Sequence, residues 1–229
     1  MVTATNGWQT VVPNLWTFDR WAFGSMKLVG EHQMPLLESV TSIPEGVTMI
    51  PYDKKMQNQS KSGNLLHFYI NDNRFPSVVL DPAGAMSQIS QFAATIGPDI
   101  SPYASHTVYM RATSIWYGKA VTALWQGHGI KTVPNVRWLF DCDLDYALCG
   151  VPTESILSVS TLGVASTKDK RSCLRRGIRR IINEKKPIKL LVHGINREDI
   201  FGEFLDSTNI EFFKPQIYAA YADSQVMHG

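Results

Sequence analysis

The sequence predicts an α/β fold with a mostly parallel sheet and β-α-β crossovers, preceded by an aromatic-rich N-terminal extension. Short, mostly apolar runs such as residues 65–70 and 188–194 are typical of strands buried on both faces, as in parallel sheets. Segments of ten to twenty residues with helical spacing of apolar side chains lie between such runs, which is the length of a crossover helix. Both an open doubly wound sheet and a small, incomplete barrel fit this pattern.

Turn residues mark the expected ends of these elements. The polar run 53–64 indicates a loop, and Gly127 and Gly129 close a helix. Pro134 implies a bulge or an early end of its strand, because proline cannot donate a ladder hydrogen bond. In chain order, we expect a strand over 65–70, a helix over 83–97, a helix over 108–127, a strand over 130–140, a strand over 155–161, a helix over 168–186, a strand over 188–194, a helix over 196–206 and a strand over 210–213.

The composition limits the class of protein. Of the 229 residues, 44% are apolar and 10% aromatic, which excludes a disordered chain or a coiled coil. The 22 basic and 20 acidic residues leave a net charge of +2, which weakens the case for a free-standing nucleic-acid binder. No run of eighteen apolar residues occurs, so we expect no membrane partner. Three cysteines and the lack of a leader pattern indicate a reduced, cytoplasmic protein.

We expect the chain to divide into three segments. Residues 1–46 form an N-terminal arm that packs on the body, 47–213 form a single α/β domain, and 214–229 form a C-terminal tail. Apolar side chains usually find a core, which favours packing of the arm. An exposed aromatic surface for a partner is the alternative. The aromatic residues of the arm are Trp8, Trp16, Phe18, Trp21 and Phe23.

Polar side chains follow the expected strands where a ligand would bind. In α/β folds, ligands bind beyond the carboxyl ends of the strands. Asp72 and Asp99 are the best candidates for a general base or a metal ligand. Arg137 is a candidate clamp for a carboxylate or phosphate. The predicted substrate-binding residues are Asn135, Arg137, Trp138, Ser160, Thr161, Gly163 and His193.

Each of these residues also has a structural interpretation. Trp138 could stack on a base or sugar, or fill a core, and the two aspartates could cap helices. The small residues from Ser160 to Gly163 lead into a helix at about 168, which suits a phosphate. The sequence contains neither a Walker pattern nor a dinucleotide fingerprint, and it predicts no metal site. The cofactor is therefore left open, with Mg²⁺ as the candidate.

One strongly basic segment favours a different function. The helix over 168–186 has an apolar face and carries arginines over much of the remaining surface. Such a cluster is usually a solvated face, and the alternative is a surface that contacts nucleic-acid phosphates. The nucleic-acid-binding candidates are Arg175, Arg176, Arg179 and Arg180.

Several segments together resemble a known family. HFYINDNRF, GPDISPY, ALWQGHGIKTVPNVRW, LDYALCGVP, SVSTLGV and LLVHG occur in the order and spacing of the family catalogued as domain of unknown function 4417, over roughly residues 47–213. The shared set is Asp72, Asp99, Asn135, Trp138, Ser160 and Gly163. The chain departs from the family at Asn71, Ser114, Lys119 and His193, where members commonly have Asp, Asn, Arg and Tyr.

The resemblance implies an origin in a phage or mobile element, and hence the host cytoplasm, but no known activity. The first hypothesis is a small α/β enzyme that acts on a nucleotide, a nucleoside or another phosphorylated substrate. Asp99 would be general base or nucleophile, and Asp72 would orient it or bind a metal. The alternative is a non-enzymatic accessory factor that binds DNA or a host protein during phage or plasmid replication or host takeover.

Overall fold

Parallel strands form the centre of the molecule. The computed structural model describes residues 26–57 and 60–215. One sheet contains β3 (Met49–Pro51), β4 (Leu65–His67), β5 (Ala94–Ile96) and β6 (Thr132–Val133), and a second contains β7 (Ile156–Ser160), β8 (Lys189–His193) and β9 (Ile210–Phe213). Every strand pair within these two sheets is parallel. The predicted α/β class with a parallel sheet is therefore confirmed.

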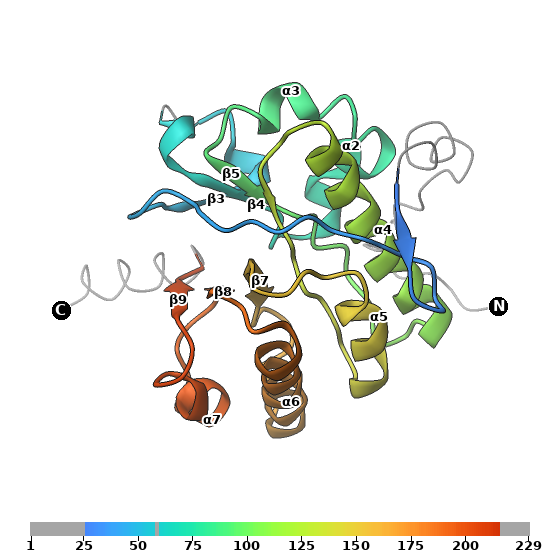
Figure 1. Cartoon of the computed structure of the whole chain (residues 1–229), viewed down its shortest axis with the longest axis vertical. Helices are drawn as coiled ribbons and strands as arrows, with labels where there is room; N and C mark the ends of the chain where they lie inside the picture. Colours follow the sequence, from blue (N-terminus) through green and yellow to red (C-terminus); the bar gives the residue numbers. More distant parts are fainter. Residues whose placement is uncertain (1–25, 58–59, 216–229) are drawn as a thin grey trace, which may run out of the picture.

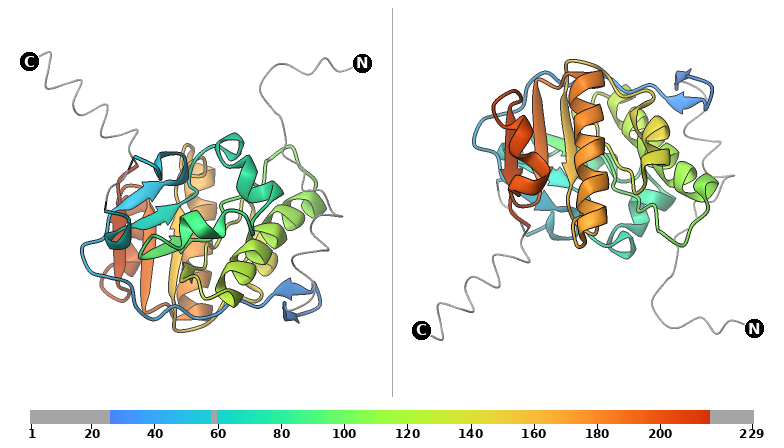
Figure 2. Two further views of the ribbon diagram at one scale, coloured as in Figure 1. Left: turned by 90° about the horizontal axis from the view of Figure 1, so that it is seen from above. Right: turned by 90° about the horizontal axis from the view of Figure 1, so that it is seen from below.

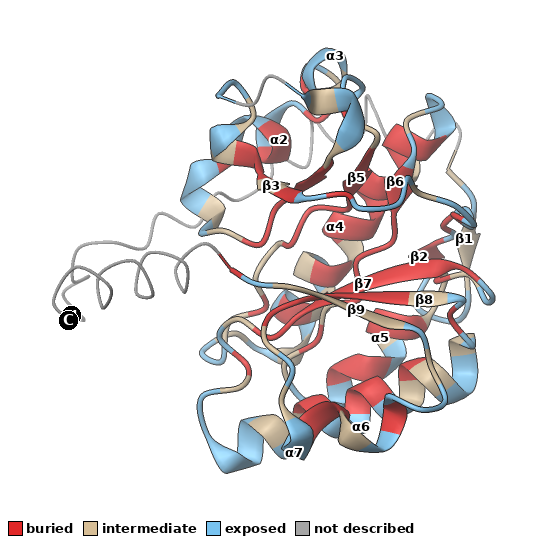
Figure 3. Ribbon diagram, turned by 90° about the vertical axis from the view of Figure 1, so that its left-hand side faces the viewer, coloured by how far each residue is buried: buried red, intermediate tan, exposed pale blue. Residues whose placement is uncertain are grey.

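The strand order favours an incomplete barrel over a doubly wound sheet. Spatial order follows chain order in both sheets, whereas a doubly wound sheet reverses its order at a switch point. A parallel bridge between Asn135 and Ser158 joins the end of β6 to β7. Within the described residues β3 and β9 are not hydrogen-bonded to each other, so the barrel stays open there. Figure 3 shows the two sheets facing each other across a buried interior.

Three apolar layers hold the barrel together. The inner cluster takes side chains from strands of both sheets, among them Leu65, Ile96, Val133 and Leu191. The outer faces of the two sheets carry separate clusters, one under the helices at the top of Figure 1 and one under those at the bottom. The interior of an α/β barrel is packed with side chains in the same way.

Helices cover both outer faces. The upper sheet is covered by α2 (Pro76–Leu80), α3 (Met86–Ile89) and α4 (Val108–Gly127). The lower sheet is covered by α5 (Leu144–Leu148), α6 (Lys168–Lys185) and α7 (Glu198–Phe201), and α6 lies along it in the right-hand view of Figure 2. Short 3-10 turns occur at Tyr52–Lys54, Lys61–Gly63, Asp72–Arg74, Asp141–Asp143 and Gly202–Phe204.

Local sequence signals place the two long helices where they were predicted. Thr107 and Thr167 are the N-caps of α4 and α6, and each side-chain oxygen accepts a hydrogen bond from a backbone N–H in the first turn. Gly129, at φ +76°, follows α4 in the left-handed region. Lys186, at φ +46°, ends α6 in the same region. Pro134 does end its strand early, after Val133.

The helix predicted over 83–97 is wrong. Only Met86–Ile89 is helical there, and Ala94–Ile96 is strand β5. Leu65 and Leu66 pair in parallel with Ala94 and Thr95. As a strand, these three buried residues form backbone hydrogen bonds with β4 on one side and β6 on the other. This tertiary pairing outweighs the helix-compatible spacing of the segment.

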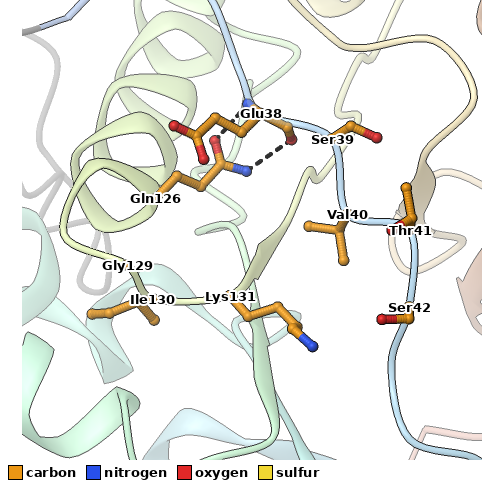
Figure 4. Close-up of a pocket in the computed structure, with 9 residues that line it drawn as sticks. All are labelled: Glu38, Ser39, Val40, Thr41, Ser42, Gln126, Gly129, Ile130 and Lys131. Atoms are coloured by element: carbon orange, nitrogen blue, oxygen red, sulfur yellow. Dashed lines mark hydrogen bonds between the residues drawn. The ribbon is translucent and has the colours of Figure 1, made fainter.

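The described part of the predicted arm crosses the amino ends of the strands. It begins with an antiparallel hairpin of β1 (Leu28–Val29) and β2 (Met34–Pro35). The following extended segment binds the upper half through Gln126, which accepts from the Glu38 N–H and donates to the Glu38 carbonyl (Figure 4). It binds the lower half at Val40, whose carbonyl accepts from the Ile156 N–H. The arm's tryptophans and the tail beyond 215 lie outside the described residues, so the predicted three-segment division stays a prediction.

Among the described residues, no helix combines the length and the apolar character that crossing a bilayer requires.

Candidate functional site

The carboxyl ends of five neighbouring strands bring most of the predicted site residues together. Asp72 starts the 3-10 turn after β4, and Asp99 follows β5. Asn135 and Arg137 lie on the segment that follows β6. Because parallel strands end at the same edge of a sheet, these side chains meet at one end of the barrel. We call this cluster the strand-end site; it contains Asp72, Asp99, Asn135, Arg137, Ser160 and His193.

A buried hydrogen-bond network links the two half-sheets in this site. The Asn135 Nδ2 amide donates to Asp99 Oδ1 at 2.9 Å. The Tyr69 hydroxyl donates to Asn135 Oδ1 at 3.0 Å and lies 2.7 Å from Ser158 Oγ. The sequence did not predict Tyr69 as a site residue, because Tyr69 lies inside the apolar, strand-like run 65–70. Its one signal was a hydroxyl group close to the polar residues that begin at Asn71.

Arg137 is the charged side chain of the site with unused hydrogen-bonding capacity. Its Nε lies 3.6 Å from Asp99 Oδ1, beyond hydrogen-bond distance, and is buried without a hydrogen-bond partner within residues 26–57 and 60–215. The Asp99 Oδ2 atom likewise has no hydrogen-bond partner among the described residues. The site therefore places a guanidinium and a carboxylate side by side, and each has one atom that makes no hydrogen bond within the described residues.

Asp72 is held by three donors from the segment after β5. Its carboxylate accepts from the Ser101 N–H and hydroxyl and from the Tyr103 hydroxyl, at 2.9 to 3.2 Å. Burial raises the pKa of Asp72, the Ser101 hydrogen bonds oppose that rise, and the neighbouring Asp99 charge adds to it. The two aspartates are therefore close enough for the charge of Asp99 to affect the pKa of Asp72.

His193 faces β4 across the barrel. Its ring stacks on Tyr69 with centroids 5.0 Å apart and lies 4.6 Å from the His67 ring. Burial lowers the pKa of His193 to about 4, and burial together with His193 lowers the pKa of His67 further below its ordinary value. Both rings are therefore neutral at pH 7 and cannot act as cations for a phosphate.

The loop after β7 largely satisfies its own backbone. Ser160 Oγ accepts from the Leu162 N–H and lies 3.5 Å from His193 Nδ1. The Val164 N–H donates to the Thr161 carbonyl, and Gly163, at φ +75°, takes a left-handed conformation that favours glycine. The Thr161 N–H also donates to the His193 carbonyl, so three N–H groups of the loop are already bonded. Few backbone donors therefore support the predicted phosphate role of Ser160, Thr161 and Gly163.

Trp138 is not brought into the strand-end site. It is buried in the outer cluster between the lower sheet and its helices. A Cβ on Gly177 of α6 would come within 2.2 Å of the Trp138 ring, so the helix approaches the indole as closely as a glycine permits. This close packing explains why a glycine, which weakens a helix, stands in the middle of α6. It also favours the interpretation that Trp138 fills a core rather than stacks on a ligand.

The basic helix is covered by intramolecular ion pairs. Arg175 and Arg179 bind Glu203 at 2.8 and 2.7 Å, and Arg176 binds Asp141 at 2.6 Å. Arg180 binds both Asp145 and Glu184. All four predicted nucleic-acid contacts therefore already have acidic partners, which lowers the positive potential that a phosphate backbone would meet.

Lys119, one of the positions that depart from the family pattern, has a structural role. Its ammonium donates to the carbonyls of Tyr146 and Cys149 at the end of α5, where a helix favours a positive charge. Burial lowers the pKa of Lys119 to about 7, while the nearby Cys149 opposes this. Ser114, the other departing position on α4, donates to the Met110 carbonyl of its own helix.

Two further features bear on ligands. In the described ranges, no group of three or more His, Cys, Asp or Glu side chains lies close enough to hold a metal ion. A cavity of about 260 Å³ lies at the opposite, amino end of the strands, between residues 38–42 and 126–131 (Figure 4). Lys131 and the hydroxyls of Ser39, Thr41 and Ser42 line it, and it shares no residue with the strand-end site.

The fold and the site together define a barrel-like α/β protein with an acidic and arginine-containing cluster at the carboxyl ends of its strands. The model of the family "Domain of unknown function (DUF4417)" matches residues 26–214, and the chain belongs to this family. The match starts before the predicted boundary at 47, so it includes the β1–β2 hairpin and the segment that crosses the strands.

The curated relatives are phage proteins. The chain is 24% identical over 163 residues to the Gene 1 protein of Mycobacterium phage L5, an alignment that covers 71% of each chain. It is also 24% identical over 163 residues to the Gene 1 protein of Mycobacterium phage D29, covering 71% of this chain and 60% of that protein. These similarities agree with the expected phage or mobile-element origin. No solved structure matches the chain.

Proposed function

We propose that the protein is a small α/β enzyme that acts on a nucleotide, a nucleoside or a phosphorylated small molecule at the strand-end site. The observation that carries this proposal is Arg137, whose Nε is buried without a hydrogen-bond partner in the part of the chain that the structure describes. A buried guanidinium donor without an acceptor is costly, and phosphate oxygens are the acceptors that arginine binds best. The neighbouring Asp99 keeps the charge partly balanced when no ligand is bound.

The two aspartates supply the acid–base chemistry in this proposal. Asp99 Oδ2 has no hydrogen-bond partner among the described residues, so in this proposal it takes a proton from a substrate hydroxyl or from water. Asp72, whose pKa is raised mainly by burial, holds a proton more readily than an ordinary carboxyl does. Carboxyl groups whose environments differ in this way are a common arrangement for paired acid and base roles.

A magnesium ion would fit this site only together with a phosphate. Magnesium is usually held by one or two carboxylates plus substrate oxygens and water. Asp99 offers one carboxylate oxygen without a hydrogen-bond partner among the described residues. Both carboxylate oxygens of Asp72 already accept hydrogen bonds from Ser101 or Tyr103. Titrations are therefore best made with and without Mg²⁺.

The test is a thermal-shift panel of nucleosides, nucleotides, sugar phosphates, inorganic phosphate and short DNA. A ligand at about a hundred times its dissociation constant adds about 2.7 kcal/mol, which is a shift of several degrees for a protein of this size. Arg137→Gln should abolish the shift. The matched control is Arg175→Gln, which removes an exposed arginine paired with Glu203 and should leave the shift intact. A panel without any shift, or an equal shift in Arg137→Gln, would overturn the proposal.

The alternative, an accessory factor that binds DNA or a host protein, has less support. The arginines that suggested it are engaged in ion pairs on the protein's own surface. DNA is included in the panel for this reason. A shift with DNA alone, with affinity falling steeply as salt rises, would favour the alternative.

A further inference from the structure

Tyr69 occupies the centre of the strand-end network, and its hydroxyl bonds to Asn135 and Ser158 rather than to Asp72, Asp99 or Arg137. We propose that Tyr69 is a positioning residue, which fixes the orientation of the Asn135 amide and, through it, the Asp99 carboxylate. What that carboxylate does rests on the proposed function. The positioning itself rests on the hydrogen bonds from Tyr69 to Asn135 and from Asn135 to Asp99.

The period of the strand explains why a tyrosine reaches this place. Successive side chains of a strand point to opposite faces. Leu65 and Tyr69 pack in the inner cluster, whereas Leu66 and Phe68 pack in the outer one beneath the upper helices. The hydroxyl of Tyr69 therefore crosses the interior of the barrel and meets Asn135 and Ser158 at the junction of the two sheets.

The direction of each hydrogen bond follows from the groups involved. A carboxylate only accepts, so the Asn135 amide must present its NH₂ to Asp99 and its oxygen to Tyr69. The phenol must then donate to that oxygen. The Ser158 hydroxyl is left to donate to the phenol oxygen or to the Leu191 carbonyl, and both lie within reach. Tyr69 thus donates to Asn135, and Asn135 donates to Asp99, so every hydrogen bond of the series points toward the Asp99 carboxylate.

Burial makes this arrangement sensitive to a single hydroxyl. Tyr69 is 3% exposed, Asn135 8% and Ser158 0%, so bulk water does not replace a lost donor. Without the phenol O–H, the Asn135 oxygen loses its partner, and the amide is held only by its hydrogen bond to Asp99. The same Asp99 Oδ1 atom lies 3.6 Å from Arg137 Nε, so a shift of the amide away from its present position also disturbs the charge pair.

The test uses Tyr69→Phe, which removes the hydroxyl and keeps the ring that stacks on His193. The readout is the pair of side-chain amide signals of Asn135 in a nitrogen-15 NMR spectrum. In Tyr69→Phe these signals should move, and their hydrogen exchange should quicken by about 2- to 10-fold, the factor expected for one lost hydrogen bond. Tyr103→Phe is the matched control, because its hydroxyl donates to Asp72 instead. It should leave the Asn135 signals in place.

The outcomes separate this inference from the proposed function. Unchanged Asn135 signals in Tyr69→Phe would overturn the positioning role, even if inorganic phosphate binds to the wild-type protein. Moved signals in a protein that binds no phosphate would leave the positioning role standing and reject the proposed function. If Tyr69→Phe does not fold, the wild-type spectrum decides the question. A slowly exchanging Tyr69 hydroxyl proton close to the Asn135 amide supports the inference, and a freely exchanging one overturns it.

Discussion

Acidification from pH 7 to pH 5 should destabilise the protein through the two histidines inside the barrel. His67 and His193 lie ring to ring, 4.6 Å apart, and each is almost completely buried. Burial lowers the pKa of His193 to about 4, and burial together with His193 lowers that of His67. Between the folded and unfolded pKa values, the unfolded chain binds protons that the folded protein does not. Stability is therefore complete above about pH 6.5 and falls as the pH drops.

The size of the effect follows from the lowered pKa of His193. A change from 6.5 to about 4, at about 1.4 kcal/mol per pKa unit, is worth about 3 kcal/mol once the pH has fallen to 4. At pH 5 the loss from this residue is about 2 kcal/mol. His67 adds to it in the same direction. Asp72 has the opposite effect on stability. Its pKa is raised in the folded protein, so as the pH falls the folded protein binds this proton before the unfolded chain does and gains stability.

The assay is urea unfolding at pH 7, 6 and 5, with the free energy extrapolated to water. The wild-type protein should lose stability over this range, and His193→Gln should lose less, because a neutral amide has no proton to gain. His128→Gln is the matched control, since it changes an exposed histidine at the end of α4. A wild-type stability that does not change between pH 7 and 5 would refute the reasoning. So would an identical pH profile in His193→Gln.

Two further predictions concern packing and buried charge. Gly177→Ala should destabilise the protein by about 1–3 kcal/mol, because the new methyl group overlaps the ring of Trp138; calorimetric melting measures it. Asp143→Asn should cost about 3–5 kcal/mol in urea unfolding, because Asp143 is fully buried and the charge of Arg111, which it holds at 2.9 Å, loses its partner.

Each of these two predictions has a control within the chain. Gly127→Ala adds the same methyl group in α4 where nothing lies within 4 Å, and should not lower the melting temperature. Asp145→Asn removes an exposed partner of Arg180 and should change the unfolding free energy far less than Asp143→Asn. Equal effects of a variant and its control would show that the loss does not come from the contact assigned to it.

Much of the candidate site was predictable, because strand ends leave a readable pattern. Asp72, Asp99, Asn135 and Arg137 follow three strands, and parallel strands must end at one edge. Tyr69 was not predictable in this way. Its hydroxyl meets Asn135 and Ser158, which lie 66 and 89 residues away in the chain, and no local pattern records such a contact.

The sequence by itself determined the local elements and the class of fold. The long helices α4 and α6 and the strands β7 and β8 follow from threonine caps, turn residues and apolar runs, all of which act within a few residues. Tertiary structure alone decided that 94–96 is a strand, that Trp138 packs against a helix, and that the arginines of α6 bind the protein's own acids. These outcomes depend on neighbours that are distant in the chain, and a sequence specifies those neighbours only once it has folded.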